Sequence, residues 1–236
     1  MADAAPDRRA ELAEALDAVE RRLAAACAAA GRRREEVLLV AVTKTRPASD
    51  VALLAELGVT DVGESRDQEA AAKAAELAGL PLRWHQVGRL QRNKARSTAR
   101  WASCVQSVDR VPLAEALSDG AVRAGRELDV LLQVSLDGDP ERGGALPQDV
   151  PALADAVAAA EGLALRGVMA VAPLGEDPAP AFERLAALAA ELRDDHPQAV
   201  AVSAGMSGDL EAAVAAGATI VRVGTALLGH RPPPGR

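Results

Sequence analysis

The stretch VLLVAVTKTRPASDVALLAELGVTDVGE, residues 37–64, contains the repeating unit that predicts the fold. Its first apolar run, residues 37–42, predicts a buried strand. The segment that follows predicts a helix over residues 47–57, which Gly58 terminates. A second short strand is expected at residues 61–64. A strand, a helix and a strand in this order predict two parallel strands joined by a right-handed crossover.

The same alternation extends in both directions from this unit. An amphipathic helix is expected before it, over residues 6–30. Further strands are expected at residues 83–88, 104–108, 128–136, 163–171, 199–203 and 219–223, and further helices at residues 68–77, 91–100, 111–124, 150–160, 178–193 and 209–216. Eight strands alternating with helices predict a single (β/α)8 TIM barrel with an extra N-terminal helix, as one domain over residues 1–236. An open doubly wound sheet is the alternative, but no G-x-G-x-x-G turn follows the first strand.

Composition and charge exclude several classes of protein. The formal net charge of −7 argues against general affinity for nucleic acid, which requires a basic footprint. Arg92, Arg96 and Arg100 recur at every fourth position and predict a solvated stripe on one helix face. Cys27 and Cys104 lie outside any metal-ligand spacing and are typical of small buried hydrophobes in a reducing compartment.

No segment of the chain predicts export or a membrane span. The N-terminus is polar and charged, without the apolar region of a signal peptide. No apolar run reaches the length that a membrane-spanning helix needs. We therefore expect a cytoplasmic protein that does not bind a membrane. We also expect it to be a monomer.

In a barrel of this kind, functional side chains gather where the strands end. Lys44 ends the first apolar strand, where partial burial lowers the pKa of an amine toward a nucleophilic state that forms Schiff bases. The alternative is a rim lysine whose ammonium reaches solvent.

The segment SAGMSGD, residues 203–209, lies between the seventh strand and a short helix. It offers glycines for close backbone approach, two serine hydroxyls and a helix N-terminus. Barrels often bind phosphate after strands seven and eight in this way. The alternative is that Ser207 only caps the helix. Gly224 and Thr225 close the eighth strand and would add backbone N–H groups from the same side.

Arg222 lies inside an apolar strand, where an unpaired guanidinium is costly. One interpretation pairs it with a barrel carboxylate such as Glu64. The other, which we favour, directs it at an acceptor on a ligand. His85 follows Trp84 on the third strand, a position typical of a hydrogen-bonded barrel histidine.

Several motifs in this order resemble one known family. They are AVTKT (41–45), GE (63–64) with QE (68–69), WHQVGRLQRNK (84–94), LRGVMA (165–170), SAGMS (203–207) with DLE (209–211), and VRVGTA (221–226). From end to end the chain resembles the pyridoxal 5′-phosphate (PLP) homeostasis family, also called the YggS or proline-synthetase co-transcribed family. Those proteins are similar to the barrel domain of alanine racemase.

The resemblance implies that PLP is the cofactor and that Lys44 carries it as an internal aldimine. It implies that Arg222 faces the pyridine nitrogen and that the two serines of residues 203–207, with Gly224 and Thr225, hold the phosphate. Ser65 stands where the family usually has Asn, and Arg142 where it has Lys. The cofactor-binding residues expected are Lys44, Ser65, His85, Ser203, Met206, Ser207, Arg222, Gly224 and Thr225.

An arginine at the pyridine nitrogen argues against broad catalysis. Because a guanidinium only donates, it leaves the nitrogen unprotonated and weakens the ring as an electron sink. Racemases compensate with two bases, one of them a Tyr, and this sequence has no Tyr. We therefore expect a PLP carrier without catalytic residues or a metal, which passes PLP to apo-enzymes. The alternatives are a residual, racemase-like PLP enzyme acting on amino acids and a Schiff-base aldolase acting on a sugar phosphate.

Overall fold

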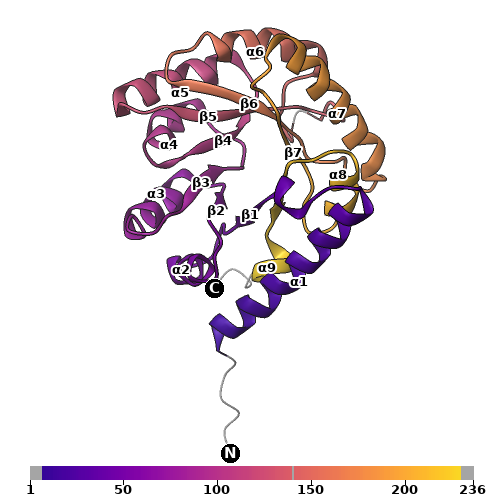
Figure 1. Ribbon diagram of the computed structural model, residues 1–236. Helices are drawn as coiled ribbons and strands as arrows, with labels where there is room; N and C mark the ends of the chain where they lie inside the picture. The colour runs from indigo at the N-terminus through magenta and orange to yellow at the C-terminus, as the bar shows by residue number, and fades with distance from the viewer. Residues whose placement is uncertain (1–6, 140, 230–236) are drawn as a thin grey trace, which may run out of the picture.

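The computed structural model describes residues 7–139 and 141–229. Eight parallel strands close into a barrel in chain order, with helices around the outside (Figure 1). The strands are β1 (Leu38–Val42), β2 (Asp61–Glu64), β3 (Arg83–Gln86), β4 (Cys104–Val108), β5 (Leu128–Gln133), β6 (Leu163–Met169), β7 (Ala201–Ser203) and β8 (Ile220–Val223). The predicted (β/α)8 barrel is confirmed, and the open sheet is wrong because β1 pairs with β8.

The helices follow the expected alternation. They are α1 (Arg8–Ala29), α2 (Ala48–Glu56), α3 (Asp67–Glu76), α4 (Ala95–Trp101), α5 (Val111–Ala124), α6 (Val150–Ala158), α7 (Pro178–Asp195), α8 (Leu210–Ala215) and α9 (Thr225–Leu228). Short 3-10 turns lie at η1 (Arg34–Glu36), η2 (Arg92–Lys94) and η3 (Pro147–Asp149). The expected start of the first helix at Pro6 lies outside the described residues. The last helix, α9, was not expected from the sequence.

The barrel has two apolar layers of different size. The larger layer lies between strands and helices and is filled mainly by Leu, Val and Ala. The smaller cluster consists of Val40, Cys104, Leu131, Met169 and Ile220, one residue from each of five strands. Because side chains alternate along a strand, residues two positions further along these strands also face the barrel axis. Three of these five residues, Gln106, Gln133 and Arg222, are polar, so polar side chains face the axis beyond the smaller apolar cluster.

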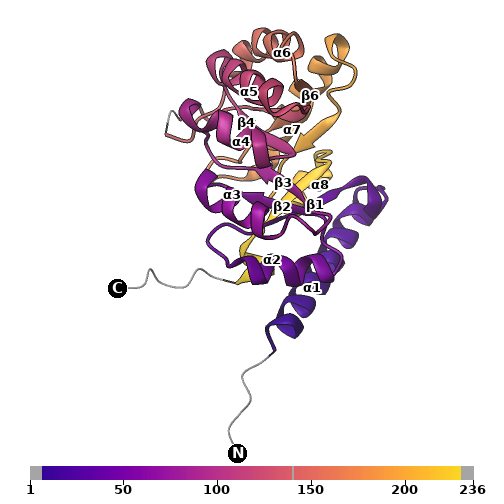
Figure 2. The same cartoon turned by 90° about the vertical axis from the view of Figure 1, so that its left-hand side faces the viewer.

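The extra helix α1 packs against the side of the barrel beside α8 and α9 (Figures 1 and 2). Arg8 forms an ion pair of 2.7 Å with Asp50 on α2. Arg32 donates to the carbonyl of Ala218 at 2.7 Å, before β8. These contacts at both ends of α1 attach it to the first and last units of the barrel, where the chain closes.

The two cysteines are buried, and the three arginines of residues 92–100 are exposed. Cys27 and Cys104 are buried and unpaired, as predicted. Arg92, Arg96 and Arg100 are all exposed, which confirms that they are solvated, but only Arg96 and Arg100 lie on α4, because Arg92 belongs to η2. Among the described residues, no helix is both long and apolar enough to cross a membrane.

Candidate functional site

Lys44 follows β1 at the carboxyl end of the barrel, beside the segment that follows β8. The register of β1 and β8 pairs Ala41 with Val223, so the residues after each strand continue side by side. A Cβ added to Gly224 would lie 3.4 Å from the carbonyl oxygen of Val42. Lys44 itself is half-buried. The fold thus brings together the lysine and the glycine that the sequence singles out.

The turn that carries Lys44 is strained. Among the described residues, Thr45 is the one non-glycine residue with a positive φ, 66°. A β-branched residue in this region is a true outlier, and such strain costs roughly 1–3 kcal/mol. The turn is held from outside by α3: the Thr45 N–H donates to Glu69 Oε1 at 2.7 Å. Lys73 Nζ donates to the Thr43 carbonyl at 3.0 Å.

The loop after β7 and the start of α9 are joined directly. The backbone N–H of Ala226 donates to Ser207 Oγ at 3.2 Å. The N-cap residue of α8 is Asp209, so the alternative that Ser207 caps the helix after this loop is wrong. Since the Ser207 oxygen accepts from Ala226, its hydroxyl proton remains able to donate to an anion.

Gly205 allows this loop to lie close to α8. It has φ +88°, and an added Cβ would lie 2.6 Å from the Ala213 side chain. From behind, the guanidinium of Arg22 on α1 donates twice to the Ser207 carbonyl, each time at 3.2 Å. Helix α1 thus supports the loop that carries the predicted phosphate residues.

Arg222 is buried inside the barrel, with 4% of its surface exposed. It donates to Ser203 Oγ at 2.6 Å and to the Ala170 carbonyl at 2.8 Å. Burial lowers the pKa of Arg222 to about 10, and the charge of Asp209 opposes that shift. The guanidinium therefore stays positive at neutral pH.

Glu64 is not the partner of Arg222, so the interpretation that pairs them is wrong. Its Oε1 accepts from Lys73 at 2.8 Å and from Thr43 at 2.7 Å, on the side of β2 that faces α3. Glu64 and Arg222 therefore face opposite sides of the barrel wall. Burial raises the pKa of Glu64, although the hydrogen bonds from Lys73 and Thr43 oppose this.

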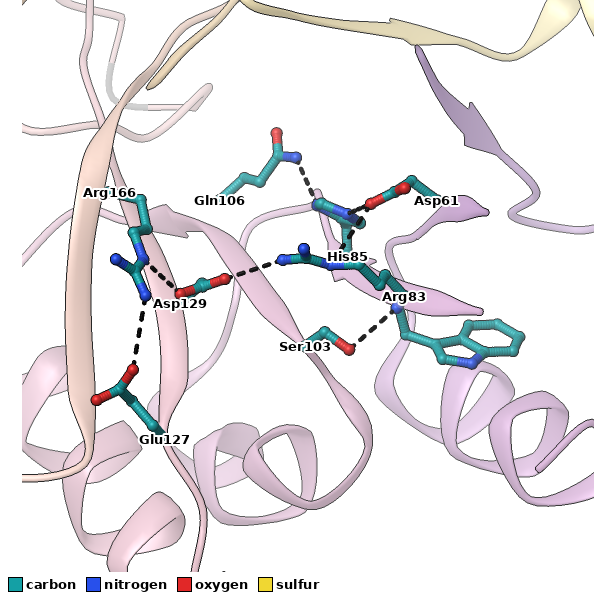
Figure 3. A network of polar contacts seen from close by, with 9 residues as sticks. Asp61, Arg83, His85, Ser103, Gln106, Glu127, Asp129 and Arg166 are labelled. Atoms are coloured by element: carbon teal, nitrogen blue, oxygen red, sulfur yellow. Dashed lines mark hydrogen bonds and ion pairs between the residues drawn. The ribbon is translucent and has the colours of Figure 1, made fainter. Parts of the chain in front are cut away.

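A chain of hydrogen bonds continues from Arg222 across the barrel. The Ser203 hydroxyl donates to Gln106 Oε1 at 2.7 Å. Gln106 Nε2 lies 2.9 Å from His85 Nδ1, and His85 Nε2 lies 2.8 Å from Asp61 Oδ1 (Figure 3). Because a carboxylate only accepts, His85 carries its proton on Nε2 and accepts from Gln106 on Nδ1. Every donor thus points toward Asp61, with Arg222 at the positive end.

The negative end of this chain joins an ionic cluster at the opposite end of the barrel. Arg83 is 2.9 Å from Asp129, and Arg166 is 2.6 Å from the same carboxylate (Figure 3). Burial alone would raise the pKa of Asp61, but hydrogen bonds from His85 and Thr60 outweigh it and lower that pKa. The charges of Arg222 and Asp61 are therefore connected through neutral groups along the axis.

The other predicted residues lie around this centre. Both ring nitrogens of His85 are hydrogen-bonded, which confirms the interpretation of a satisfied barrel histidine. Met206 and Thr225 are exposed at the open end. Ser65 lines a cavity of about 470 Å³ beside Arg89. In this arrangement the Ser203 hydroxyl supports Arg222, and its contact with a phosphate remains a prediction.

Arg142, which stands in place of the family lysine, closes the loop after β5. It donates to the Ala172 carbonyl at 2.6 Å and forms an ion pair of 2.5 Å with Asp137. Its guanidinium therefore attaches this loop to the segment after β6.

Three polar residues of the site were not predicted from the sequence: Lys73, Gln106 and Asp61. Lys73 had one usable signal, because it lies four residues after Glu69 and three after the buried Ala70 on one helix face. Gln106 and Asp61 occupy alternate, inward positions of their strands. A polar residue at an inward strand position was the available signal for both.

The fold and the site define a barrel of the alanine racemase type. The chain matches the family described as alanine racemase, N-terminal domain, over residues 15–232. The pyridoxal phosphate homeostasis protein of Mycobacterium tuberculosis is 49% identical over 246 residues, covering 96% of this chain and 95% of that protein. The protein of the same name from Pseudomonas aeruginosa is 45% identical over 199 residues, covering 82% of this chain and 84% of that one.

A solved structure of PipY from Synechococcus elongatus, with PLP bound, has a TM-score of 0.82 and 37% sequence identity. It covers 92% of this chain and 100% of that one. This chain belongs to the family of pyridoxal phosphate homeostasis proteins.

Proposed function

We propose that this protein binds PLP through Lys44 and acts in PLP homeostasis as a carrier of the cofactor rather than as an enzyme. Its membership of the homeostasis family, and the PLP-bound PipY structure that matches 92% of the chain, carry the PLP-binding part of this conclusion. The residues assigned to the cofactor, and the carrier role, are supported by the chemistry of the site.

Lys44 is the amine best suited to hold PLP. The sequence has three lysines, Lys44, Lys73 and Lys94. Lys73 donates to three acceptors within 3.0 Å, which uses all three protons of its ammonium. Lys94 is also partly buried but lies in η2, eight residues after the end of β3. Lys44 is half-buried two residues after β1, beside the segment that follows β8 and carries Gly224 and Thr225.

The residues present fit the other two groups of PLP. Ser207 has a hydroxyl proton to donate, and Gly205 supplies a turn that any side chain would obstruct. With Gly224 and Thr225, they would hold the phosphate. Arg222 offers further guanidinium protons to the pyridine nitrogen while it stays bonded to Ser203.

When bound, PLP supplies an aldehyde for attachment and a ring that can withdraw electrons. Attachment joins the Lys44 nitrogen to the aldehyde carbon, and the aldehyde oxygen leaves as water. Arg222 keeps the pyridine nitrogen unprotonated, since a guanidinium that remains charged donates but does not protonate its neighbour. No Tyr exists in this sequence to serve as a second base. These two properties favour storage and exchange over turnover.

An absorbance scan of the purified protein tests this proposal. We expect a visible band with added PLP that borohydride reduces, with the label mapped to a peptide containing Lys44 and absent from Lys44→Ala. The matched control is Lys94→Ala, which should keep the band. A colourless protein that takes up no PLP would contradict the proposal and favour the aldolase alternative.

Two further assays address the carrier role and its partners. We expect no racemisation of amino acids by the loaded protein, and transfer of PLP to an apo PLP-dependent enzyme. Steady turnover that depends on Lys44 would instead support a residual PLP enzyme. We also propose a monomer in the cytoplasm, which light scattering after gel filtration and cell fractionation would test.

A further inference from the structure

We propose that Glu69 and Lys73 on α3 are positioning residues: they hold the strained turn that carries Lys44 and so set its amine for PLP. This inference rests on the proposed function. The two side chains are separated from the barrel axis by the wall of the barrel, and they act through the backbone on either side of Lys44.

Both peptide groups of Lys44 are held from the same helix. The carbonyl of the preceding peptide, on Thr43, accepts from Lys73 Nζ at 3.0 Å. The N–H of the following peptide, on Thr45, donates to Glu69 Oε1 at 2.7 Å. With the peptides on both sides fixed, the direction in which the Lys44 side chain leaves the backbone is fixed as well.

The two positioning residues also hold each other. Lys73 Nζ lies 2.7 Å from the same Glu69 oxygen that accepts from Thr45. They are four residues apart on α3, the spacing at which side chains of a helix meet. Lys73 has 7% of its side chain exposed, so this ion pair is poorly screened by solvent. The turn is therefore attached to a rigid unit.

The residues around the Lys44 turn have features that a contribution to stability alone does not explain. Among the described residues, Thr45 Oγ1 and Glu64 Oε2 belong to the few buried side-chain atoms without a hydrogen-bond partner. In the part of the chain that the structure describes, Thr45 is also the one non-glycine residue with a positive φ. Unpaired buried atoms and strained backbone persist where the surrounding structure holds them, and they concentrate at functional sites. Here both occur in the residues that adjoin and support Lys44.

The central test compares Glu69→Ala with Glu76→Ala, an exposed glutamate on the same helix. We expect Glu69→Ala to slow PLP attachment and to weaken PLP binding at least tenfold, while Glu76→Ala leaves both unchanged. We choose Glu69, which is partly exposed, because Lys73→Met would leave the buried Glu64 charge unpaired and can prevent folding.

A second substitution separates positioning from general damage. Glycine adopts positive φ without strain, so Thr45→Gly lessens the need for the contact from Glu69. We expect Glu69→Ala to weaken PLP binding much less in the Thr45→Gly background than in the wild-type background. An equal loss in both backgrounds would contradict the proposal, since a purely structural role would not depend on residue 45.

Hydrogen exchange at the Thr45 amide gives a measurement that needs no PLP. We expect this amide to be protected in the wild type and in Glu76→Ala, and to exchange rapidly in Glu69→Ala. If the wild type binds no PLP, the proposed function fails, whereas the exchange still decides whether Glu69 holds the turn. If PLP binds equally well to the wild type and to Glu69→Ala, the positioning role fails and the proposed function stands.

Discussion

At the scale of single residues, Arg222 has two tasks that follow from its planar fork. Its two terminal nitrogens bond Ser203 and the Ala170 carbonyl inside the barrel. A buried guanidinium with fixed partners presents its remaining protons in a defined direction. This geometry distinguishes arginine from lysine at the same position, although both carry one positive charge.

We therefore predict that Arg222→Lys weakens PLP binding about tenfold, or about 1.4 kcal/mol, because an ammonium cannot reproduce the fork. A titration followed by absorbance measures the affinity. Arg166→Lys, in the ionic cluster at the opposite end of the barrel, should leave the affinity unchanged. Equal affinities for Arg222→Lys and the wild type would show that PLP binding does not depend on the planar guanidinium of Arg222.

Asp61 predicts a pH dependence of stability. Its pKa is lower in the folded protein than the ordinary 3.8, because hydrogen bonds from His85 and Thr60 outweigh burial. Such a carboxylate stabilises the fold fully above pH 3.8, and this stability is lost as pH falls through the lower folded value. We predict that Asp61→Asn loses less unfolding free energy than the wild type between neutral pH and about pH 3.

Urea denaturation at several pH values measures this difference. Asp119→Asn, an exposed carboxylate on α5, is the matched control and should follow the wild type. Parallel curves for Asp61→Asn and the wild type would mean that Asp61 is not ionised in its bond with His85.

At the scale of elements, the loop between β7 and α8 depends on one glycine. Gly205 has φ +88°, and a Cβ there would overlap the Ala213 side chain at 2.6 Å. Gly208, in the same loop, has open space around its Cα. The two glycines have the same chemistry and a different environment, which makes them a matched pair.

We predict that Gly205→Ala lowers the unfolding free energy by roughly 1–3 kcal/mol and weakens PLP binding, because the loop must move away from α8. Gly208→Ala should change neither quantity. Chemical denaturation and PLP titration of both variants provide the measurement. If both variants lose affinity equally, the loop conformation is not what holds the ligand.

Helix α3 illustrates what local patterns predict and what they miss. Its expected range, residues 68–77, agrees within one residue with the observed Asp67–Glu76. The burial of Lys73 was not expected, because an isolated lysine in an alanine-rich helix is usually solvated. Its position depends on Glu69, four residues earlier on the same helix, and on Glu64, which only the packing of α3 on β2 brings within reach.

At the scale of the whole molecule, the barrel closes through close contacts between neighbouring strands. Gly167 on β6 has φ +149°, and a Cβ there would lie 1.9 Å from the Ala201 carbonyl oxygen on β7. No side chain can occupy that space without separating the two strands. Closure of the barrel at β6 and β7 therefore requires glycine at this position.

We predict that Gly167→Ala destabilises the whole barrel by more than about 4 kcal/mol, since a backbone clash in the sheet has no local remedy. Gly79→Ala, where a Cβ meets nothing within 4 Å, should leave the melting temperature close to that of the wild type. Thermal denaturation monitored by circular dichroism measures both. A Gly167→Ala protein with an unchanged melting temperature would contradict this account of closure.

Much of this protein could be predicted from the sequence. The eight strands, their order and the extra helix follow from apolar periodicity, which acts within one element at a time. The positions of Lys44 and Gly205 just after strands, and of Arg222 within the last strand, follow from the same pattern. So does the loop at residues 203–209. The lack of Tyr is a property of composition alone.

Packing between segments that are distant in the chain sets where the strands end and which polar groups meet. The apolar run at residues 128–136 continues past Gln133, where β5 ends, because pairing depends on the length of neighbouring strands. Arg222 bonds Ser203 rather than Glu64. In the closed barrel, the side chains of Arg222 and Ser203 face inward, whereas that of Glu64 faces α3. These strand pairings and hydrogen bonds join residues that are far apart in the chain. Local sequence patterns carry no information about which distant residues come into contact.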